Sequence, residues 1–448
     1  MNEGHSALLA LELLQEQLAT SPPPPIRTAA AAVAKCCVFT THTPVPAGHD
    51  VFAFGLVEKY LAAYWPTLGL DRDRFLALGA DHEPRGTAFN MTALALRLSG
   101  HRNAVSRRHG EVSRRMWRPL WPDASSEDAV PIATVTNGVH VPSWVATEMD
   151  ALFRRYLGED WVARHDDPAL WAGVTELPDR ALWEVRRGLT RTLLDLIRER
   201  ARARWAEDRI DPGQVTAAGV LLDPDALTIG FARRFATYRR ATLILRDLPR
   251  LRAILTHPRR PVQLVFAGKA HPADEGGKQL LQTVYRAARD PELGGRLAFL
   301  EDYDMHAARY LVQGVDLWLN TPTPPMEASG TSGQKAALNG VPNLSVLDGW
   351  WAEAYDGTNG WAIGEPAGAP LDEAARDAAD AEALYRVLER EVVPLYYDRG
   401  PDGLPGGWLR VVRRAIETSG AAFSARRMVK EYVGTFYTDA ATAAEGDR

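Results

Sequence analysis

The second half of the chain alternates short apolar runs with longer stretches of helical spacing, and this alternation restricts the possible fold more than any other feature. The apolar runs lie at residues 226–231, 262–266, 297–300, 317–319 and 344–347. Strands that alternate with helices predict βαβ units, so we expect a parallel sheet. Ligands of such sheets bind at the carboxyl ends of the strands, and we expect the functional residues there.

Length and charge narrow the class of protein further. The chain has 448 residues, which is long for a single core and predicts two α/β domains. A hydrophobic share of 46% and a charged share of 24% are typical of a soluble globular enzyme. The net charge of −5 gives no general attraction to nucleic acid, and no apolar run is long enough to span a membrane. We therefore expect neither as a partner, and any anion site must be local.

The predicted domains are residues 1–145, residues 146–422 with a helical lead-in, and a C-terminal helix and tail at 423–448 that crosses back onto the first domain. Residues 6–18 and 408–437 have helical spacing, and residues 88–118 indicate a helix followed by a turn.

The cysteines Cys36 and Cys37 are adjacent on a predicted strand at 36–40. Neighbouring side chains on a strand point to opposite faces, so a disulfide between them is not expected. This cysteine usage fits a reducing cytoplasm.

Polar residues follow four of the predicted strands. They are Arg233, Arg234 and Tyr238–Arg240 after the first strand, Gly268–His271 with Lys269 after the second, Glu301–Tyr303 after the third, and Glu327–Lys335 after the fourth. The carboxyl ends of parallel strands meet at one edge, so these groups should lie together. Basic groups at two of the ends predict a local pocket for phosphates.

The apolar run 315–320 and the stretch 325–340 that follows it predict a strand, a Gly-rich turn and a helix start. Gly330, Thr331, Ser332 and Gly333 leave backbone N–H groups that can face an anion, although an ordinary βα loop has the same composition. Lys335 follows on the helix, where an amine above a phosphate-binding turn suits a Schiff base to pyridoxal 5'-phosphate.

Residues Glu327–Gly340 resemble the cofactor segment of the α-glucan (glycogen, starch, maltodextrin) phosphorylases, E-A-S-G-T-x-x-x-K-x-x-L-N-G. Gln334 stands where the family usually has methionine. The resemblance implies an α/β chain with two Rossmann-like domains of the GT-B type, the first incomplete here. It also implies retaining phosphorolysis of terminal α-1,4 glucosyl units to glucose 1-phosphate, with α-glucan and inorganic phosphate as substrates.

Further segments resemble the family in order along the chain. Thr41-His42-Thr43 is similar to its N/T-H-T turn, and Val135–His140 to its sugar-contact turn. Residues 233–240 match its R-x-x-x-x-[KR]-[KR] phosphate segment, with Arg239 where most members have lysine. Asn103–His109 is similar to N-G-V-S-x-x-H. Ala104 replaces the glycine there, which would cost roughly 1 kcal/mol if that position has positive φ.

The resemblance assigns roles to these positions and assigns no residue to a metal. The glucosyl unit is held by His42, Asn137 and Glu327, with His5 and Ser329 as further contacts. Substrate phosphate is held by Arg234 and Arg239, with Lys269 as a further contact. The cofactor residues are Lys335, Arg233, Gly330, Thr331, Ser332, Tyr303 and Trp144.

Two other functions stay open. A sugar-nucleotide glycosyltransferase of the same fold would carry a second glutamate where Lys335 stands, and an inactive remnant would bind only glucan or a partner chain. The family has a long segment before the position of Met1, including a Gly-rich loop over the cofactor. We therefore expect an unpaired sheet edge in the first domain, weak cofactor binding and little activity from the chain alone. A complementing N-terminal fragment or a homodimer would then be its partner.

Overall fold

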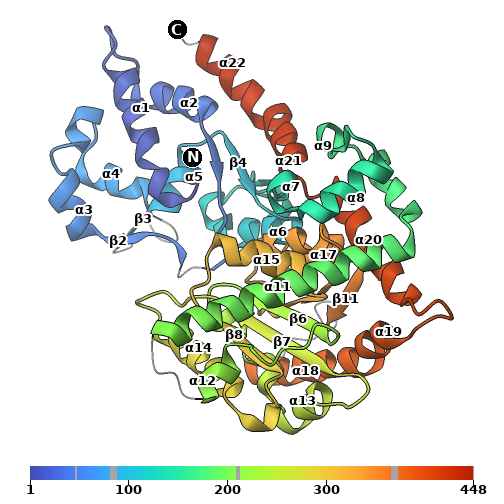
Figure 1. The fold of residues 1–448 in the computed structure, drawn as a ribbon. Helices are drawn as coiled ribbons and strands as arrows, with labels where there is room; N and C mark the ends of the chain where they lie inside the picture. The colour runs from blue at the N-terminus through green and yellow to red at the C-terminus, as the bar shows by residue number, and fades with distance from the viewer. Residues whose placement is uncertain (46–47, 81–87, 208–211, 365–371, 447–448) are drawn as a thin grey trace. The chain divides into compact units, whose positions relative to one another are not determined.

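The computed structural model describes residues 1–45, 48–80, 88–207, 212–364 and 372–446. The chain forms two compact units (Figure 1). The first unit comprises Met1–Asn137, Pro325–Ser329 and Met428–Arg448, and the second comprises Gly138–Pro324 and Gly330–Arg427. Among the described residues, no helix combines the length and the apolar character needed to cross a membrane.

The second unit is built on a six-stranded parallel sheet in the order β11-β10-β9-β6-β7-β8. Its strands are β6 (Leu227–Ala232), β7 (Val262–Ala267), β8 (Leu297–Leu300), β9 (Leu317–Asn320), β10 (Asn343–Val346) and β11 (Gly360–Ile363). Five of these strands confirm the sequence prediction. The strand β11 was not predicted, because it is only four residues long and begins with a glycine.

Both faces of this sheet are covered by helices, as the alternation along β7 shows. Leu264 and Phe266 pack into the core that contains Leu251 and Val284, whereas Val265 packs on the other face. The helices on the first face are α13 (Leu248–Leu255), α14 (Glu275–Ala288) and α18 (Glu373–Val387). Those on the other face are α11 (Asp179–Glu207), α15 (Met305–Gly314) and α16 (Thr331–Ala337). The helix α20 (Gly406–Gly420) packs against α10 (Pro168–Ala172), α11 and α16. Continuous apolar strands are what a sheet buried on both faces requires.

The helical lead-in predicted from residue 146 is confirmed. The remaining helices of the second unit are α7 (Val141–Trp144), α8 (Thr147–Leu157), α9 (Trp161–Arg164), α10 (Pro168–Ala172), α12 (Pro212–Ala217), α17 (Trp351–Ala354) and α19 (Val393–Tyr397). A π-helical segment, Leu388–Val392, joins α18 to α19.

The first unit contains a three-stranded parallel sheet in the order β1-β4-β5. These strands are β1 (Val38–Thr40), β4 (His101–Ala104) and β5 (Ala133–Thr134). On the side of β1 away from β4, the Thr40 N–H donates to the Met1 carbonyl at 3.0 Å, and the Glu3 N–H donates to the Thr40 carbonyl at 3.1 Å. Residues 1–3 therefore pair with β1 through an isolated bridge at Asn2 and Thr40, and the expectation of an unpaired edge for the sheet as a whole stays a prediction.

Two other local predictions for the first unit are wrong. Cys36 ends the helix α2 (Ile26–Cys36) and only Cys37 leads into the strand; both thiols are free. The run from His101 to Ala104 forms β4 in the middle of the sheet instead of a turn. Ala104 is therefore extended, and alanine carries no positive-φ cost there.

The other elements of the first unit surround this sheet. They are α1 (Leu8–Leu18), the antiparallel pair β2 (Val51–Ala53) and β3 (Ala88–Asn90), α3 (Phe54–Leu61), α4 (Arg72–Leu78), α5 (Met91–Arg97), α6 (Arg107–Trp117) and α22 (Thr438–Gly446). The helix predicted at 6–18 is confirmed by α1. The C-terminal segment enters this unit through α21 (Ala425–Tyr432) and a π-helical segment, Val433–Tyr437, and α22 packs against α2.

The passages between the units differ by a few residues from the predicted boundaries at 145 and 423. The Val139 N–H donates to the Phe423 carbonyl at 2.8 Å, and the Ala425 N–H donates to the Val139 carbonyl at 2.8 Å. Since this pairing holds the two passages together, residues 138–145 and 423–427 both belong to the second unit.

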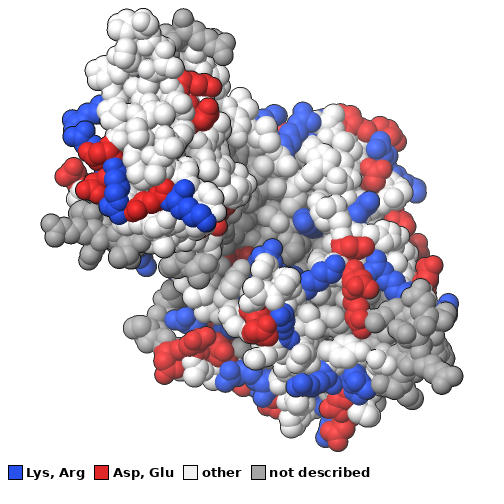
Figure 2. Space-filling model, turned by 90° about the vertical axis from the view of Figure 1, so that its left-hand side faces the viewer, with Lys and Arg blue, Asp and Glu red and all other residues white. Residues whose placement is uncertain are grey.

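Charge is mixed on the molecular face that Figure 2 presents. Lys and Arg side chains are interspersed there with Asp and Glu, without a broad area of one sign. A face of this kind offers no extended basic stripe along which a nucleic-acid backbone could bind.

Candidate active site

Lys335 lies on α16, one turn after a residue with left-handed backbone. Gly330 precedes the helix with φ of 83°, and no side chain caps the helix start, so the first N–H groups point out of the turn. The Lys335 Nζ lies 3.8 Å from the centroid of the Trp144 ring. Burial lowers the pKa of this amine below its ordinary value. A half-buried amine of lowered pKa is suited to condensation with an aldehyde, because the neutral form is the nucleophile.

Asn339 explains why Trp144 and Lys335 meet. It is fully buried, and its Oδ1 accepts a hydrogen bond from the Ala146 N–H at 2.8 Å. Its Nδ2 donates to the Trp144 carbonyl at 2.8 Å and to the Lys335 carbonyl at 2.9 Å. One amide side chain therefore ties the two backbone segments together. The sequence pattern contained Asn339, but sequence reasoning gave it no role.

Asn343 and Trp350 pack tightly against the Gly-rich turn at Gly333. A Cβ on Gly333 would lie 2.3 Å from Asn343 Oδ1 and 2.9 Å from the Trp350 ring, so only glycine fits. Trp318 Nε1 donates to Ser332 Oγ at 3.2 Å. The turn, its uncapped N–H groups and the nearby amine together fit a ligand that carries both a phosphate and an aldehyde, as pyridoxal 5'-phosphate does.

Arg233 and Tyr303 extend this group along the carboxyl ends of β6 and β8. Arg233 is buried, and its Nη1 donates to Asn320 Oδ1 at the end of β9. Burial raises the pKa of Tyr303 to about 12, although the nearby charge of Arg233 lowers it. Tyr303 therefore stays protonated beside the guanidinium over the physiological range.

The other predicted phosphate ligands lie at the ends of β6 and β7. Arg234 and Lys269 are exposed. Arg239 is half-buried, and its Nε donates to the Tyr238 hydroxyl at 2.8 Å. The Phe235 N–H donates to the Lys269 carbonyl at 2.9 Å, so the backbone of the two strand ends stays paired beyond the sheet.

Arg240 holds this arginine loop and does not belong to its ligand-facing groups. It is buried with a left-handed φ of 44°. Its guanidinium donates to the carbonyls of Thr321 and Pro322 and pairs with Asp377 at 2.9 Å and Asp380 at 2.7 Å. A left-handed arginine costs about 1–2 kcal/mol, which these contacts offset.

In the first unit, His42 is held by residues at the start of the chain. His42 Nε2 lies 2.5 Å from Asn2 Oδ1, and the His42 N–H donates to the Glu3 carboxylate. Glu3 also accepts from Thr43 Oγ1 at 2.9 Å, and its own φ is 60°. Burial lowers the pKa of His42, while Glu3 opposes this effect. His5, predicted as a sugar contact, is exposed, and Asn2 and Glu3 are the residues of that segment that contact the His42 loop.

The segment 325–329 of the first unit carries the predicted sugar ligands Glu327 and Ser329. Both side chains are buried, and within the described part of the chain Ser329 Oγ has no hydrogen-bond partner. A buried hydroxyl without a partner is rare in proteins and indicates a place for a polar ligand. The Asn137 N–H, in the same unit, donates to the Val105 carbonyl at 2.9 Å.

The candidate residues therefore form a set within each unit. The second unit brings together Lys335, Trp144, Arg233, Tyr303 and the Gly-rich turn, and the first unit anchors His42, Asn137 and Glu327. Sequence reasoning missed the residues that hold them in place. These are Asn2, Glu3, Ser106, His109, Arg240, Asn320 and Asn339. Most of them lie inside the segments that resemble the family, and their place in those segments was the only sign in the sequence that they matter.

Two α/β units on parallel sheets, with polar groups at the strand ends, are the architecture of the GT-B glycosyltransferases, and the predicted fold class is confirmed. The family model described as carbohydrate phosphorylase matches residues 1–358. The chain belongs to the carbohydrate phosphorylase family.

Characterised relatives agree with this membership. A glycogen phosphorylase of Aquifex aeolicus is 46% identical over 406 residues, covering 91% of this chain and 58% of the relative. A maltodextrin phosphorylase of Thermococcus litoralis is 44% identical over 98% of this chain and 50% of the relative. For a glycogen phosphorylase of Mycobacterium tuberculosis the identity is 44%, over 98% of this chain and 51% of the relative. The chain thus spans about half the length of the curated relatives it matches.

Proposed function

We propose that the chain carries the pyridoxal-phosphate and substrate groups of an α-glucan phosphorylase, which cleaves terminal α-1,4 glucosyl units with inorganic phosphate and retains the anomeric configuration. The observation that carries this proposal is the Lys335 amine, which lies 3.8 Å from the Trp144 ring on a helix whose start is uncapped. Relatives named glycogen and maltodextrin phosphorylases support the substrate class.

The second unit would bind the cofactor and the substrate phosphate. Lys335 would anchor pyridoxal 5'-phosphate, with Gly330, Thr331 and Ser332 at its phosphate and Trp144 and Tyr303 against its ring. When bound, the cofactor supplies through its phosphate group a proton donor and acceptor for the substrate phosphate. Arg233 would balance the charge of the cofactor phosphate, because it is buried and fixed by Asn320.

Arg234, Arg239 and Lys269 would attract and orient inorganic phosphate. Their positions at the ends of β6 and β7 support this role, and a guanidinium can bind a phosphate through two parallel hydrogen bonds. Arg239 is already oriented by the Tyr238 hydroxyl, which reduces the entropy lost on binding.

The first unit would supply the contacts to the glucosyl unit. His42, Asn137, Glu327 and Ser329 offer both donors and acceptors, as sugar hydroxyls require. The lowered pKa of His42 keeps the ring neutral at neutral pH, so one ring nitrogen can accept a hydrogen bond. The unpartnered Ser329 hydroxyl supports its place among these contacts.

Reduction of the protein with borohydride after incubation with pyridoxal phosphate tests the cofactor site. The label is expected on Lys335, because burial favours its neutral amine. Lys269 and Lys278 serve as internal controls, since Lys269 is exposed at a neighbouring strand end and Lys278 pairs with Glu275. A label chiefly on Lys269 would contradict the assignment.

An assay for glucose 1-phosphate with maltodextrin and phosphate tests the reaction itself. Formation that depends on phosphate and is lost in Lys335→Ala supports the proposal. Transfer from a sugar nucleotide without pyridoxal phosphate would instead favour a glycosyltransferase of the same fold.

A further inference from the structure

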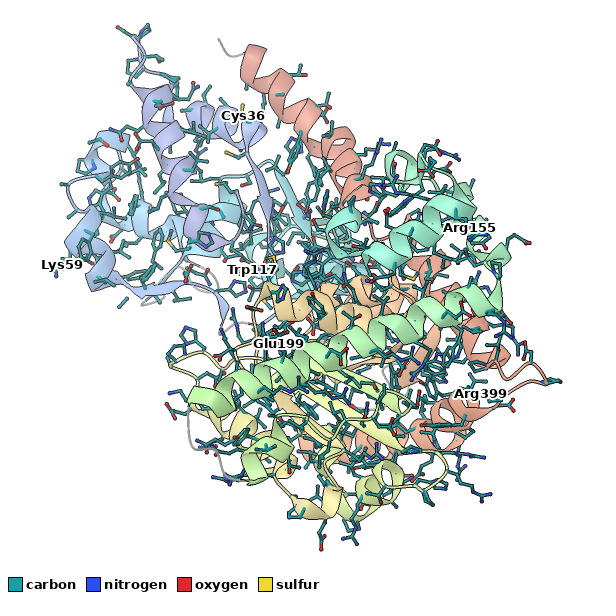
Figure 3. All side chains as sticks on the ribbon, viewed as in Figure 1. Cys36, Lys59, Trp117, Arg155, Glu199 and Arg399 are labelled. Carbon is teal, nitrogen blue, oxygen red and sulfur yellow. The ribbon has the colours of Figure 1, made fainter. Side chains whose placement is uncertain are left out.

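The turn between β4 and α6, residues 104–109, contacts all three backbone segments that carry the proposed sugar ligands. Its residues Val105, Ser106 and His109 are each at most 1% exposed. All its contacts described below lie within the first unit. The helix α6 begins at this turn and ends at Trp117, which is labelled in Figure 3.

Ser106 contacts the segment that carries Glu327. Its Oγ donates to the Ala328 carbonyl at 2.6 Å and accepts a hydrogen bond from the His109 N–H at 3.0 Å. The second bond is an ordinary N-cap, which any of several residues could make. The first bond contributes nothing to α6, and it fixes the backbone between Glu327 and Ser329.

Val105 contacts the next ligand segment through its backbone. Its carbonyl accepts a hydrogen bond from the Asn137 N–H at 2.9 Å, so the turn fixes the backbone position of Asn137. Its N–H donates to His109 Nδ1 at 3.4 Å. His109 and Asn137 therefore both hydrogen-bond to the backbone of Val105.

His109 also lies close enough to the His42 loop to be affected by it. The Thr43 backbone raises the pKa of His109 and the charge of His42 lowers it, while among the described residues His109 Nε2 has no hydrogen-bond partner. Burial is the larger effect and lowers the pKa to about 4. The ring is thus neutral at pH 7. Since Nδ1 accepts from the Val105 N–H, the proton of the neutral ring is on Nε2.

We propose that Ser106 and His109 are positioning residues for the sugar site, which set the spacing of His42, Asn137 and Glu327 through one buried turn. This inference rests on the proposed function. A sugar hydroxyl is read by hydrogen bonds whose strength falls steeply with distance and angle, so ligands from three separate segments need a shared anchor.

The variants are chosen to separate this role from plain stability. Ser106→Ala removes the bond to Ala328. His109→Asn keeps an oxygen near Nδ1 for the Val105 N–H but is too short to reach Thr43. Ser113→Ala is the matched control, because Ser113 is a buried serine of the same helix, and among the described residues no hydrogen bond joins it to a ligand segment.

Hydrogen exchange of the whole chain is the first measurement, since it does not depend on activity. Ser106→Ala should speed exchange about tenfold in residues 327–330, which corresponds to one lost hydrogen bond. His109→Asn should do so in residues 41–45 instead. Ser113→Ala should change neither segment. Unchanged exchange in both variants, or a uniform rise across the first unit, would overturn the proposal.

Steady-state kinetics are the second measurement. Both positioning variants should raise KM for maltodextrin about tenfold, while KM for phosphate changes by less than about twofold, because phosphate is held by the second unit. Equal changes in both constants would overturn the proposal. Absence of glucose 1-phosphate formation by the wild-type chain would count against the proposed function alone, and the exchange result would still decide the positioning role.

Discussion

At the scale of single residues, the segments that resemble the family contain two kinds of side chain. Some are the residues proposed to bind a ligand, such as Lys335 and Ser329. Others, such as Asn339 and Ser106, are buried and form hydrogen bonds with the backbone of the segments that carry the first kind. Both kinds are needed, because a ligand-binding group works only when its own backbone is fixed.

His109 gives a prediction about pH. Its pKa is about 4 in the folded chain and 6.5 ordinarily, with burial as the main cause and His42 and His49 adding to it. As the pH falls below 6.5 the unfolded chain binds the proton first. The contribution of His109 is therefore full above pH 6.5 and is lost between pH 6.5 and 4, by about 3 kcal/mol in the free energy of unfolding.

The variant His109→Gln cannot bind that proton and should lack this part of the pH dependence. Urea unfolding followed by circular dichroism between pH 4 and 7.5 measures the difference. If the free energy of unfolding depends on pH in the same way for the wild type and His109→Gln, the pKa of His109 does not differ between the folded and unfolded chains, and the prediction is wrong.

At the scale of elements, one carboxylate joins four of them in the second unit. Asp316, just before β9, accepts from the Thr228 N–H of β6 at 2.9 Å and from the Tyr396 hydroxyl of α19 at 3.3 Å. Burial raises the pKa of Asp316, and the nearby charges of Arg187 and Arg186 on α11 oppose this effect. A buried charge with several partners is costly to leave incomplete.

Asp316→Ala should lower the free energy of unfolding by about 3–5 kcal/mol, because it leaves the buried guanidinium groups short of a counter-charge. Asp225→Ala is the matched control. Asp225 pairs with the same Arg187 at 2.8 Å, but its side chain is 79% exposed, so its loss should cost less than about 1 kcal/mol. Similar losses for the two variants in thermal unfolding would contradict this account.

The sequence was sufficient to predict the elements that repeat a strong pattern. Continuous apolar runs gave β6 to β10, and helical spacing gave α1 and α8 to α11. The strand β4 was missed, because its residues His101 to Ala104 are mostly polar and only Asn103 and Ala104 are buried. Asn103, for example, donates to the Tyr432 hydroxyl at 2.7 Å. A partner more than three hundred residues away leaves no local signal.

The same limit applied to the candidate site. Lys335 and the Gly-rich turn could be recognised because their chemistry follows from local sequence. The contacts that hold these groups in place could not be recognised, because they join distant parts of the chain. Ser106 and Ala328 are 222 positions apart, and Asn339 and Trp144 are 195 positions apart. Sequence patterns indicate which groups gather, and only the folded chain shows what fixes them.

At the scale of the whole molecule, the first unit is assembled from three separate parts of the chain. Its last part enters the core through Tyr432, which is 7% exposed and packs against Phe436 with ring centroids 6.0 Å apart. Together with Val135 these residues form a small apolar cluster of their own. The stability of the first unit should therefore depend on residues that follow the entire second unit in sequence.

Tyr432→Ala tests this dependence. It removes a buried ring and the hydroxyl that accepts from Asn103, so the first unit should lose about 3 kcal/mol. Hydrogen exchange in β1 and β4 should then rise about a hundredfold. Val429→Ala, at a half-exposed position on the same helix, should leave both strands unchanged. The sheet of the second unit has its own core, so exchange in β6 and β7 and the labelling of Lys335 should stay as in the wild type. An equal rise in β1 and β6 would instead mean that the two units unfold as one, and that the cofactor lysine depends on the whole chain.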